Sequence, residues 1–428
     1  MNHAWPLGRD FWTGEFPQQT SGRTAPYLFK NIIPSNAASP ADVLAGLATM
    51  RRAHVAGTAS AAKARVYVGE ERRDELVDTV LTADGWDDGG FVPWMQALVG
   101  AERFSLVLNN LETVSPRLSA GLGAFLASLF EGWGVPIGGA EQAVFLGNYS
   151  GTAFGVHEGA EDAFLIHLGP GTKLFYCWPG DEYQKLTGGK EPLFGDYGWL
   201  LEHGECFTME PGDALFLPRR VFHVGRQDDF SISVATPLYT YPDARLVRLS
   251  VLPELLDEVL GENPGDEFGT PSPMHESASG NAAAAQRLTA LARTALDQVG
   301  ELLDARVAEH VERRWEKVLS NGGWEPLDID LARDEAAAAF RPEHVVPGAT
   351  VVIPDPYQLR ISGPQRAFLR GVEVGIGTEP LVADLVTALN THAAVTLPDD
   401  EALLTAVRAL GTTGGIHLTT TTTLEGAA

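Results

Sequence analysis

The sequence predicts a mainly β chain with added helices, in which a barrel of short strands precedes a helical segment and a small mixed domain. Short apolar runs separated by Gly, Pro and Asp turns fill residues 140–242, which is typical of a sandwich or barrel. A long amphipathic helix is predicted over 283–319, and strand and helix patterns alternate from 340 to the end. A chain of 428 residues is too long for one core. We expect domains at 1–245, 246–335 and 336–428.

The N-terminal 140 residues mix helix and strand signals. Residues 39–53 start with Ser39 as a helix cap and Pro40 at the first helical position. Apolar residues alternate through "RFSLVLNNLE", residues 103–112, which predicts a strand. The apolar pattern of "PRLSAGLGAFLASLFEGWG" predicts a helix that ends near Gly132.

Composition excludes several classes of function. The net charge of −25 disfavours nucleic acid, and the helix expected after residue 399 has Arg408 as its only cation. No apolar run is long enough to span a membrane, and the N-terminus has no secretory signal pattern. Two cysteines, Cys177 and Cys206, cannot form a disulfide framework. We therefore expect a cytoplasmic protein that binds neither nucleic acid nor membranes.

The strongest motif is "EPGDALFLPRRVFHVG", residues 210–225. The spacing of Gly212, Pro218 and His223 is that of the second cupin motif. "PGD" predicts a turn, "ALFLP" a strand that Pro218 ends, and His223 is expected to point into the barrel. Arg220 stands where that motif usually has Gly, so we expect Arg220 in a backbone conformation that Gly adopts more easily.

A second histidine lies in "GVHEGAEDAFLIHLGPGTKLFYCWP", residues 155–179. His157 and His223 are 66 positions apart (223 − 157), which is too far for a local zinc knuckle but natural for two strands of one barrel. Two histidines and one carboxylate on one face of a metal form the facial triad of non-haem iron oxygenases. Such a triad leaves three coordination positions for substrate, co-substrate and oxygen.

These segments together resemble the Jumonji-C oxygenases, most closely their ribosomal-oxygenase-like (cupin-4) branch. The resemblance is strong over 140–237 and weaker elsewhere, where it includes the long helix and the C-terminal elements. It implies a double-stranded β-helix (jelly-roll or cupin) barrel, a helical dimerisation segment and a winged-helix-like C-terminal domain. It further implies a homodimer.

The same resemblance implies an Fe(II)- and 2-oxoglutarate-dependent hydroxylase. Such enzymes act on C–H bonds of peptide or protein side chains and, less often, of small molecules, so a peptide, a protein or a specialised metabolite is the expected substrate. His157 and His223 correspond to iron ligands. Lys173 falls where the family has the cation that pairs with the distal carboxylate of 2-oxoglutarate, and a buried carboxylate needs such a partner.

Polar residues on neighbouring strands are further candidates for the co-substrate site. Asn148 and Tyr149 lie on the strand before His157. Ser231 and Ser233 alternate with apolar residues, which places both hydroxyls on one face of their strand. His167 stands where the family often has Gln.

The sequence departs from the family at the carboxylate, since His-x-Asp is replaced by His157, Glu158 and Gly159. In one interpretation another acid is the ligand. Glu161 is then the best candidate, because many cupins use His-x3-Glu, and Glu158 and Asp162 come next. In a second interpretation a halide fills the position, as in 2-oxoglutarate halogenases, which have a small residue there. In a third, iron binding is lost and the barrel is a catalytically silent binding module.

Overall fold

The computed structural model describes residues 4–83, 85–86, 90–152, 154–195, 197–261 and 281–419. It divides into two compact units, one formed by residues 1–239 with 316–428 and the other by 240–315. The Pro/Gly/Ser-rich stretch predicted to be a mobile loop lies, over 262–280, outside the described residues. In the described parts of the chain, no helix is long and apolar enough to cross a membrane.

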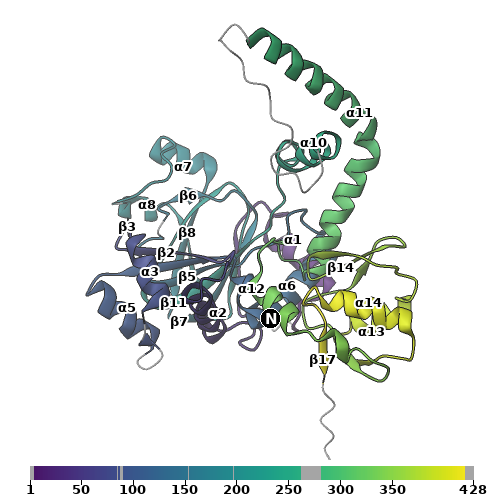
Figure 1. Ribbon diagram of the computed structural model, residues 1–428. Helices are drawn as coiled ribbons and strands as arrows, with labels where there is room; N and C mark the ends of the chain where they lie inside the picture. The colour runs from purple at the N-terminus through teal and green to yellow at the C-terminus, as the bar shows by residue number, and fades with distance from the viewer. Residues whose placement is uncertain are drawn as a thin grey trace, which may run out of the picture. The chain divides into compact units, whose positions relative to one another are not determined.

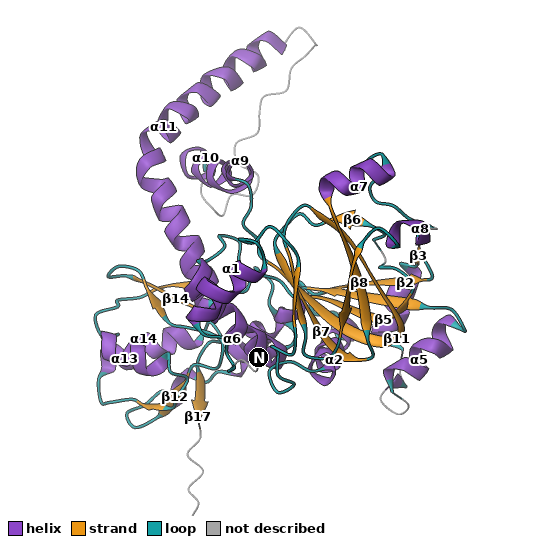
Figure 2. Ribbon diagram, turned by 180° about the vertical axis from the view of Figure 1, so that it is seen from behind, coloured by secondary structure: helices purple, strands orange, loops and turns teal. Residues whose placement is uncertain are grey.

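Antiparallel strands form the barrel of the first unit (Figure 2). In the described chain they make one eleven-stranded sheet, whose main path runs β1-β10-β7-β11-β5-β4-β2-β3. Off this path, β6 and β8 pair with β11, and β9 pairs with β8. The β-rich stretch predicted over 140–242 is confirmed and forms part of this antiparallel sheet. The strands are β1 (Tyr27–Phe29), β2 (Lys63–Val68), β3 (Glu71–Arg72), β4 (Phe104–Asn109), β5 (Ala143–Tyr149), β6 (His157–Glu158), β7 (Ala163–Pro170), β8 (Lys173–Pro179), β9 (Glu205–Met209), β10 (Ala214–Leu217) and β11 (Val221–Pro237).

Strand β11 belongs to both halves of the barrel. Its first part, from Val221, pairs with β6 and β8, and its second part, from Ser231, pairs with β5 and β7. The pairing with β5 shifts in register between Gln227 and Ser231, and such a bulge bends a strand and increases its twist. One strand therefore carries His223 in one half of the barrel and the two buried serines in the other.

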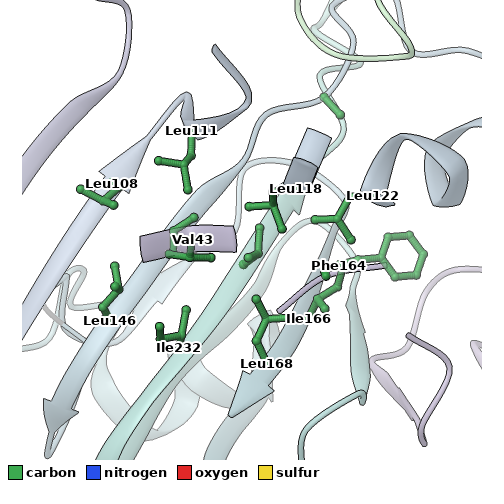
Figure 3. Close-up of a cluster of buried hydrophobic side chains, with 14 of the residues drawn as sticks. Val43, Leu108, Leu111, Leu118, Leu122, Leu146, Phe164, Ile166, Leu168 and Ile232 are labelled. Atoms are coloured by element: carbon green, nitrogen blue, oxygen red, sulfur yellow. The ribbon is translucent and has the colours of Figure 1, made fainter. Parts of the chain in front are cut away.

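Helices cover the outer face of the sheet, with α2 (Pro40–Val55), α3 (Glu75–Thr82), α5 (Phe91–Val99) and α6 (Pro116–Trp133) the main ones. The predicted cap is present, because the Ser39 side chain accepts from the amide of Asp42 at the start of α2. Figure 3 shows Val43 of α2 packed over the sheet beside Leu146 and Ile232. All three are buried, so α2 and the sheet share one core.

Shorter helices complete the barrel region. They are the π-helix η1 (Phe11–Glu15), α1 (Phe16–Gln19), the 3-10 helix η2 (Leu111–Thr113), α7 (Gly180–Thr187) and α8 (Gly198–Leu201). Helices α7 and α8 follow β8 and lie near β6 and β8 (Figure 1). Trp178, Tyr183 and Leu200 pack together there in a small core of their own.

The C-terminal region has its own hydrophobic core within the first unit. The helices and strands predicted for it are present, and the last strand pairs with the first. A winged-helix-like arrangement of these elements stays a prediction. They are α12 (Leu331–Ala339), the 3-10 helix η5 (Pro342–His344), β12 (Thr350–Val352), β13 (Arg360–Ile361), β14 (Arg366–Leu369), β15 (Val372–Gly375), α13 (Ala383–Leu389), β16 (Val395–Thr396), α14 (Glu401–Gly411) and β17 (His417–Thr419).

Residues far apart in sequence meet at Ala140, just before β5. Leu238 forms an antiparallel bridge with Ala140, and Trp324 forms a parallel one. The buried indole of Trp324 also donates to the carbonyl of Ser119 in α6 at 3.2 Å. The core of the barrel unit is thus completed by residues that follow the long helix.

The second unit consists of α9 (Asp243–Leu246), the π-helix η3 (Val247–Val251), α10 (Leu252–Leu260) and most of α11 (Asn281–Ser320). The long helix predicted over 283–319 is confirmed. The apolar stripe of this amphipathic helix includes Leu288, Leu291 and Val299, and Val299 is buried against α10. Leu288 and Leu291 of the same stripe are 56% and 53% exposed, so the described part of this unit leaves that end of the stripe uncovered.

Candidate metal and co-substrate site

Two histidines from distant parts of the sequence meet inside the barrel. His157 on β6 and His223 on β11 are register partners, and their ring centroids lie 4.4 Å apart. Strand β6 is only two residues long and is held in place by β11. The turn geometry around Pro218 and the pairing of these strands therefore bring the two imidazoles together, as the motif spacing predicts.

Both imidazoles are oriented through their Nδ1 atoms. Nδ1 of His157 lies 3.0 Å from the carbonyl oxygen of Gly155, and Nδ1 of His223 lies 3.1 Å from that of Val221. A carbonyl oxygen only accepts, so each Nδ1 carries the hydrogen and each Nε2 presents a lone pair. Metal-ligating histidines are commonly held in this way, with the second ring nitrogen bonded to the protein.

The surroundings keep both rings uncharged. Burial lowers the pKa of His157, against which the Gly155 carbonyl and the charge of Glu191 act. Burial and the neighbouring His157 lower the pKa of His223 to about 3, which the bond to the Val221 carbonyl opposes. Phe175 stacks on His223 at 5.4 Å between ring centroids. Neutral, immobilised imidazoles are the form that binds a transition metal.

Lys173 is buried, and among the described residues its ammonium is hydrogen-bonded to neutral side chains. Its Nζ donates to the hydroxyl of Tyr149 at 2.5 Å and to Oε1 of Gln227 at 3.3 Å, and the side chain is 1% exposed. Burial lowers its pKa to about 7. Gly225 makes room for it, because a Cβ there would lie 3.0 Å from Cε of Lys173. An ammonium held by neutral groups favours the entry of a carboxylate.

His167, Ser231 and Ser233 form a buried polar cluster beside the turn at Gly171. Nε2 of His167 lies 2.7 Å from the Gly171 carbonyl and therefore donates to it, while Nδ1 lies 3.0 Å from the hydroxyl of Ser233. The Ser231 hydroxyl donates to the same carbonyl at 3.2 Å. Burial, followed by the charge of Lys173, lowers the pKa of His167 to about 4. The cluster is thus a neutral wall of the barrel interior.

The other predicted co-substrate residues have separate places. Tyr149 contacts Lys173. Oδ1 of Asn148 instead accepts from the amide of Phe104 at 3.2 Å, and in the described chain Asn148 forms no hydrogen bond with Lys173. Gln227 was not predicted from the sequence. The one feature that marks Gln227 is that it is a buried polar residue on β11, in register with Tyr149 of β5.

Gly159 marks the position of the missing carboxylate. A Cβ built on it would lie 3.3 Å from Cε1 of His223, so an aspartate there would place its carboxylate beside that ring. In the part of the chain that the structure describes, no three His, Cys, Asp or Glu side chains form a group able to hold a metal. Glu161, the predicted third ligand, is therefore not brought together with the two histidines.

The two other acidic candidates are engaged with the turn between β10 and β11. Oε1 of Glu158 lies 3.6 Å from Nε of Arg220. Oδ1 of Asp162 accepts from the amide of Arg219 at 2.8 Å. Asp162 thus supports the turn that precedes His223, and neither acid joins the histidines in a three-ligand group among the described residues.

Arg220 adopts the strained conformation expected from the motif, with φ of +67°. The left-handed region costs a residue with a Cβ about 1 kcal/mol relative to Gly. We expect Arg220→Gly to raise the free energy of unfolding by roughly that amount, measured by urea unfolding. Arg219→Gly is the matched control and should lower it. A destabilised Arg220→Gly variant would show that the largely exposed ion pair with Glu158 outweighs the strain.

No protein-family model matches the sequence, and no curated protein matches it. Solved structures do match. The crystal structure of the Escherichia coli ribosomal oxygenase YcfD superposes with a TM-score of 0.54 at 16% identity, covering 98% of this chain and all of that one. YcfD in complex with cobalt and 2-oxoglutarate gives 0.50 at 17% identity over 95% of this chain and 98% of that one. The complex with cobalt and succinic acid gives 0.52 at 16% identity, with the same coverage.

These similarities show that the chain shares its fold with the ribosomal oxygenase YcfD, as the resemblance in sequence implies. They extend over nearly the whole chain, including the regions where the sequence resemblance is weak. At this identity the similarity concerns the fold, and the chemistry has to be inferred from the residues in the barrel.

Proposed function

We propose that the protein is an Fe(II)- and 2-oxoglutarate-dependent oxygenase that hydroxylates a C–H bond of a peptide or protein side chain or of a specialised metabolite. The observation that carries this proposal is the pair of neutral imidazoles, His157 and His223, whose Nδ1 atoms are bonded to carbonyls and whose Nε2 atoms are available. The shared fold with an oxygenase that binds cobalt and 2-oxoglutarate supports it.

The residues present suit these cofactors by donor type. His157 and His223 would hold the iron, and imidazole is a preferred ligand of Fe(II). Lys173 would bind the distal carboxylate of 2-oxoglutarate, and Tyr149 and Gln227 would keep the ammonium in place. Iron with 2-oxoglutarate supplies the oxidising power for C–H hydroxylation when bound. The protein binds and orients the reactants and excludes water with the buried rings around the histidines.

Calorimetric titration of the metal-free chain with Mn(II), with and without 2-oxoglutarate, tests the proposal. We expect one metal per chain and a 2-oxoglutarate affinity that depends on the metal. With Fe(II) and oxygen, 2-oxoglutarate should slowly yield succinate even without substrate. A pure protein that binds no metal would contradict the proposal and favour the catalytically silent binding module instead.

The binding of 2-oxoglutarate should depend on pH through Lys173. Its pKa is about 7 in the free protein, so the ammonium is lost as the pH rises above 7, and binding must then take up a proton. We expect the affinity to be constant below pH 6.5 and to fall about tenfold per pH unit between pH 7.5 and 9. Calorimetry at fixed Mn(II) measures it. Lys173→Arg, which stays charged, should remove the dependence, and an unchanged affinity up to pH 9 in the wild type would refute this role.

We propose that the protein is a homodimer formed through α11. Leu288 and Leu291 are more than half exposed although they continue a stripe that is buried at Val299. A second copy would cover them. We expect a dimer in light scattering and a monomer for the Leu288→Glu/Leu291→Glu variant. Leu296→Glu, which alters an equally exposed residue outside the stripe, is the control. A monomeric wild type would contradict the proposal.

A further inference from the structure

The sheet face that carries the co-substrate residues continues as far as β2. The ammonium of Lys173 lies 5.0 Å from the ring centroid of Tyr149 and 5.9 Å from that of Phe145, so both rings of β5 point into the barrel. Phe145 is in register with Val107 of β4, and Val107 is in register with Arg65 of β2. Residues directly opposite each other share one face of a sheet, so Arg65 stands on the interior face, two strands from β5 (Figure 2).

Phe154, in the loop between β5 and β6, connects Arg65 with the metal-binding pair. Its ring lies edge-on to that of His157, with 5.6 Å between the centroids. The same ring contacts Phe145 and Tyr67 at 6.0 and 6.1 Å between centroids. The Cζ atom of Arg65 lies 5.4 Å from the centroid of Phe154. A single aromatic ring therefore separates the guanidinium from a histidine proposed to hold the iron.

The charge of Arg65 is not balanced by a bonded carboxylate. Among the described residues its guanidinium donates to Oδ1 of Asn109 and forms no ion pair. The Asn109 amide donates in turn to Oε1 of Glu141 at 2.6 Å. That carboxylate also accepts from the amide of Asn110 and from the hydroxyl of Tyr239. A neutral amide thus stands between the guanidinium and Glu141, and the cation can accept an anionic partner.

Arg65 also lines a cavity of about 740 Å³ next to β2. This volume is in the range of sites that bind small organic molecules. Two basic residues in its wall, His54 and Arg72, lie within ion-pair distance of exposed aspartates. Lys63 is the fourth basic residue there, and like Arg65 it forms no ion pair in the described chain. In a protein of net charge −25, two such cations provide a local attraction for an anion.

We propose that Arg65 binds a carboxylate of the substrate, and that the substrate is a small organic acid with an apolar body. The inference rests on the proposed function and narrows its substrate to the metabolite class. The carboxylate pairs with Arg65 at the cavity, and the apolar body lies along Phe154 towards His157. The guanidinium suits this role because its planar fork offers two parallel N–H donors to one carboxylate.

The test uses the full-length chain saturated with Mn(II) and 2-oxoglutarate, so that the co-substrate site is filled and no turnover takes place. Calorimetry then measures the affinities for 3-phenylpropanoate and for its neutral analogue 3-phenylpropanamide. We expect the carboxylate to bind at least tenfold more tightly than the amide, because only the carboxylate forms a hydrogen-bonded ion pair with Arg65. Arg65→Gln should reduce this ratio to below about threefold and leave the affinity for the amide unchanged.

Two further variants separate the charge from the packing of the site. Arg65→Lys keeps the cation and should keep a preference for the carboxylate, at a smaller ratio. Arg23→Gln is the matched control, because the Cζ atom of Arg23 also lies over an aromatic ring, 4.4 Å from the centroid of Trp133, and it should behave like the wild type.

A ratio near one in the wild type would overturn the inference, as would an unchanged ratio in Arg65→Gln or a failure of both probes to bind. A wild type that takes up neither Mn(II) nor 2-oxoglutarate would overturn the proposed function itself, and this outcome is recognised before any probe is added.

Discussion

Replacing His223 with asparagine is expected to weaken Mn(II) binding at least 100-fold and to abolish succinate formation. The Asn amide nitrogen corresponds to imidazole Nδ1 and can still donate to the Val221 carbonyl, whereas nothing replaces Nε2. The variant therefore removes the ligand atom and retains the contact that orients the side chain. Calorimetry with Mn(II) measures the first effect, and anaerobic loading with Fe(II) followed by oxygen measures the second.

His203→Asn is the control for this variant, since His203 is exposed in the same unit. It should bind metal like the wild type. Urea unfolding without metal should differ little between the two variants, because the pKa of His223 is about 3 and no charge is lost at neutral pH. Unchanged metal affinity in His223→Asn would show that the metal, if bound, is held elsewhere.

Replacing Lys173 with methionine is expected to change binding and stability in opposite directions. The variant should lose at least 100-fold in 2-oxoglutarate affinity, since a buried carboxylate would have no charged partner. It should also unfold at higher urea concentration. A pKa of about 7, against an ordinary value of 10.5, means that the folded wild type destabilises the ammonium. Removing the amine should stabilise the ligand-free protein by about 5 kcal/mol below pH 7.

The sign of this stability difference can be tested by varying pH. Between pH 7 and 10 the unfolded chain binds the proton of Lys173 more tightly than the folded chain does, so the wild type becomes more stable as the pH rises. The difference between Lys173→Met and the wild type should therefore shrink towards pH 10. Denaturant unfolding at pH 6.5, 8 and 9.5 measures it. A variant less stable than the wild type at pH 6.5 would show that the bonds to Tyr149 and Gln227 outweigh burial of the charge.

Much of the barrel could be predicted because its signals are local. Ser39 and Pro40 fix the start of α2, and the spacing of Gly212, Pro218 and His223 describes one turn and two strands. Even the left-handed Arg220 follows from comparing one position with the glycine expected there. Where a residue acts through its own turn or strand, periodicity and motif spacing were sufficient.

Contacts between segments could not be predicted in the same way. Spacing alone favoured Glu161 as a ligand, but distance along the sequence does not say where a side chain in a turn points. Gln227 reaches Lys173 because a bulge in β11 changes the register. The carboxylate of Glu191 accepts from the amide of Glu158 on a separate segment, a contact that no pattern in the sequence reveals.

The two bridges at Ala140 have a consequence for protein engineering. Because Leu238 and Trp324 flank this residue, the chain departs from the barrel and rejoins it at neighbouring positions. The helical unit between them is topologically an insertion within a discontinuous domain. A chain truncated after the last barrel strand would lack the buried Trp324 side chain, which would leave a cavity next to α6. Excising the insert and joining the flanking residues of the barrel unit with a short linker would keep the Trp324 side chain and is the better route to a minimal barrel fragment.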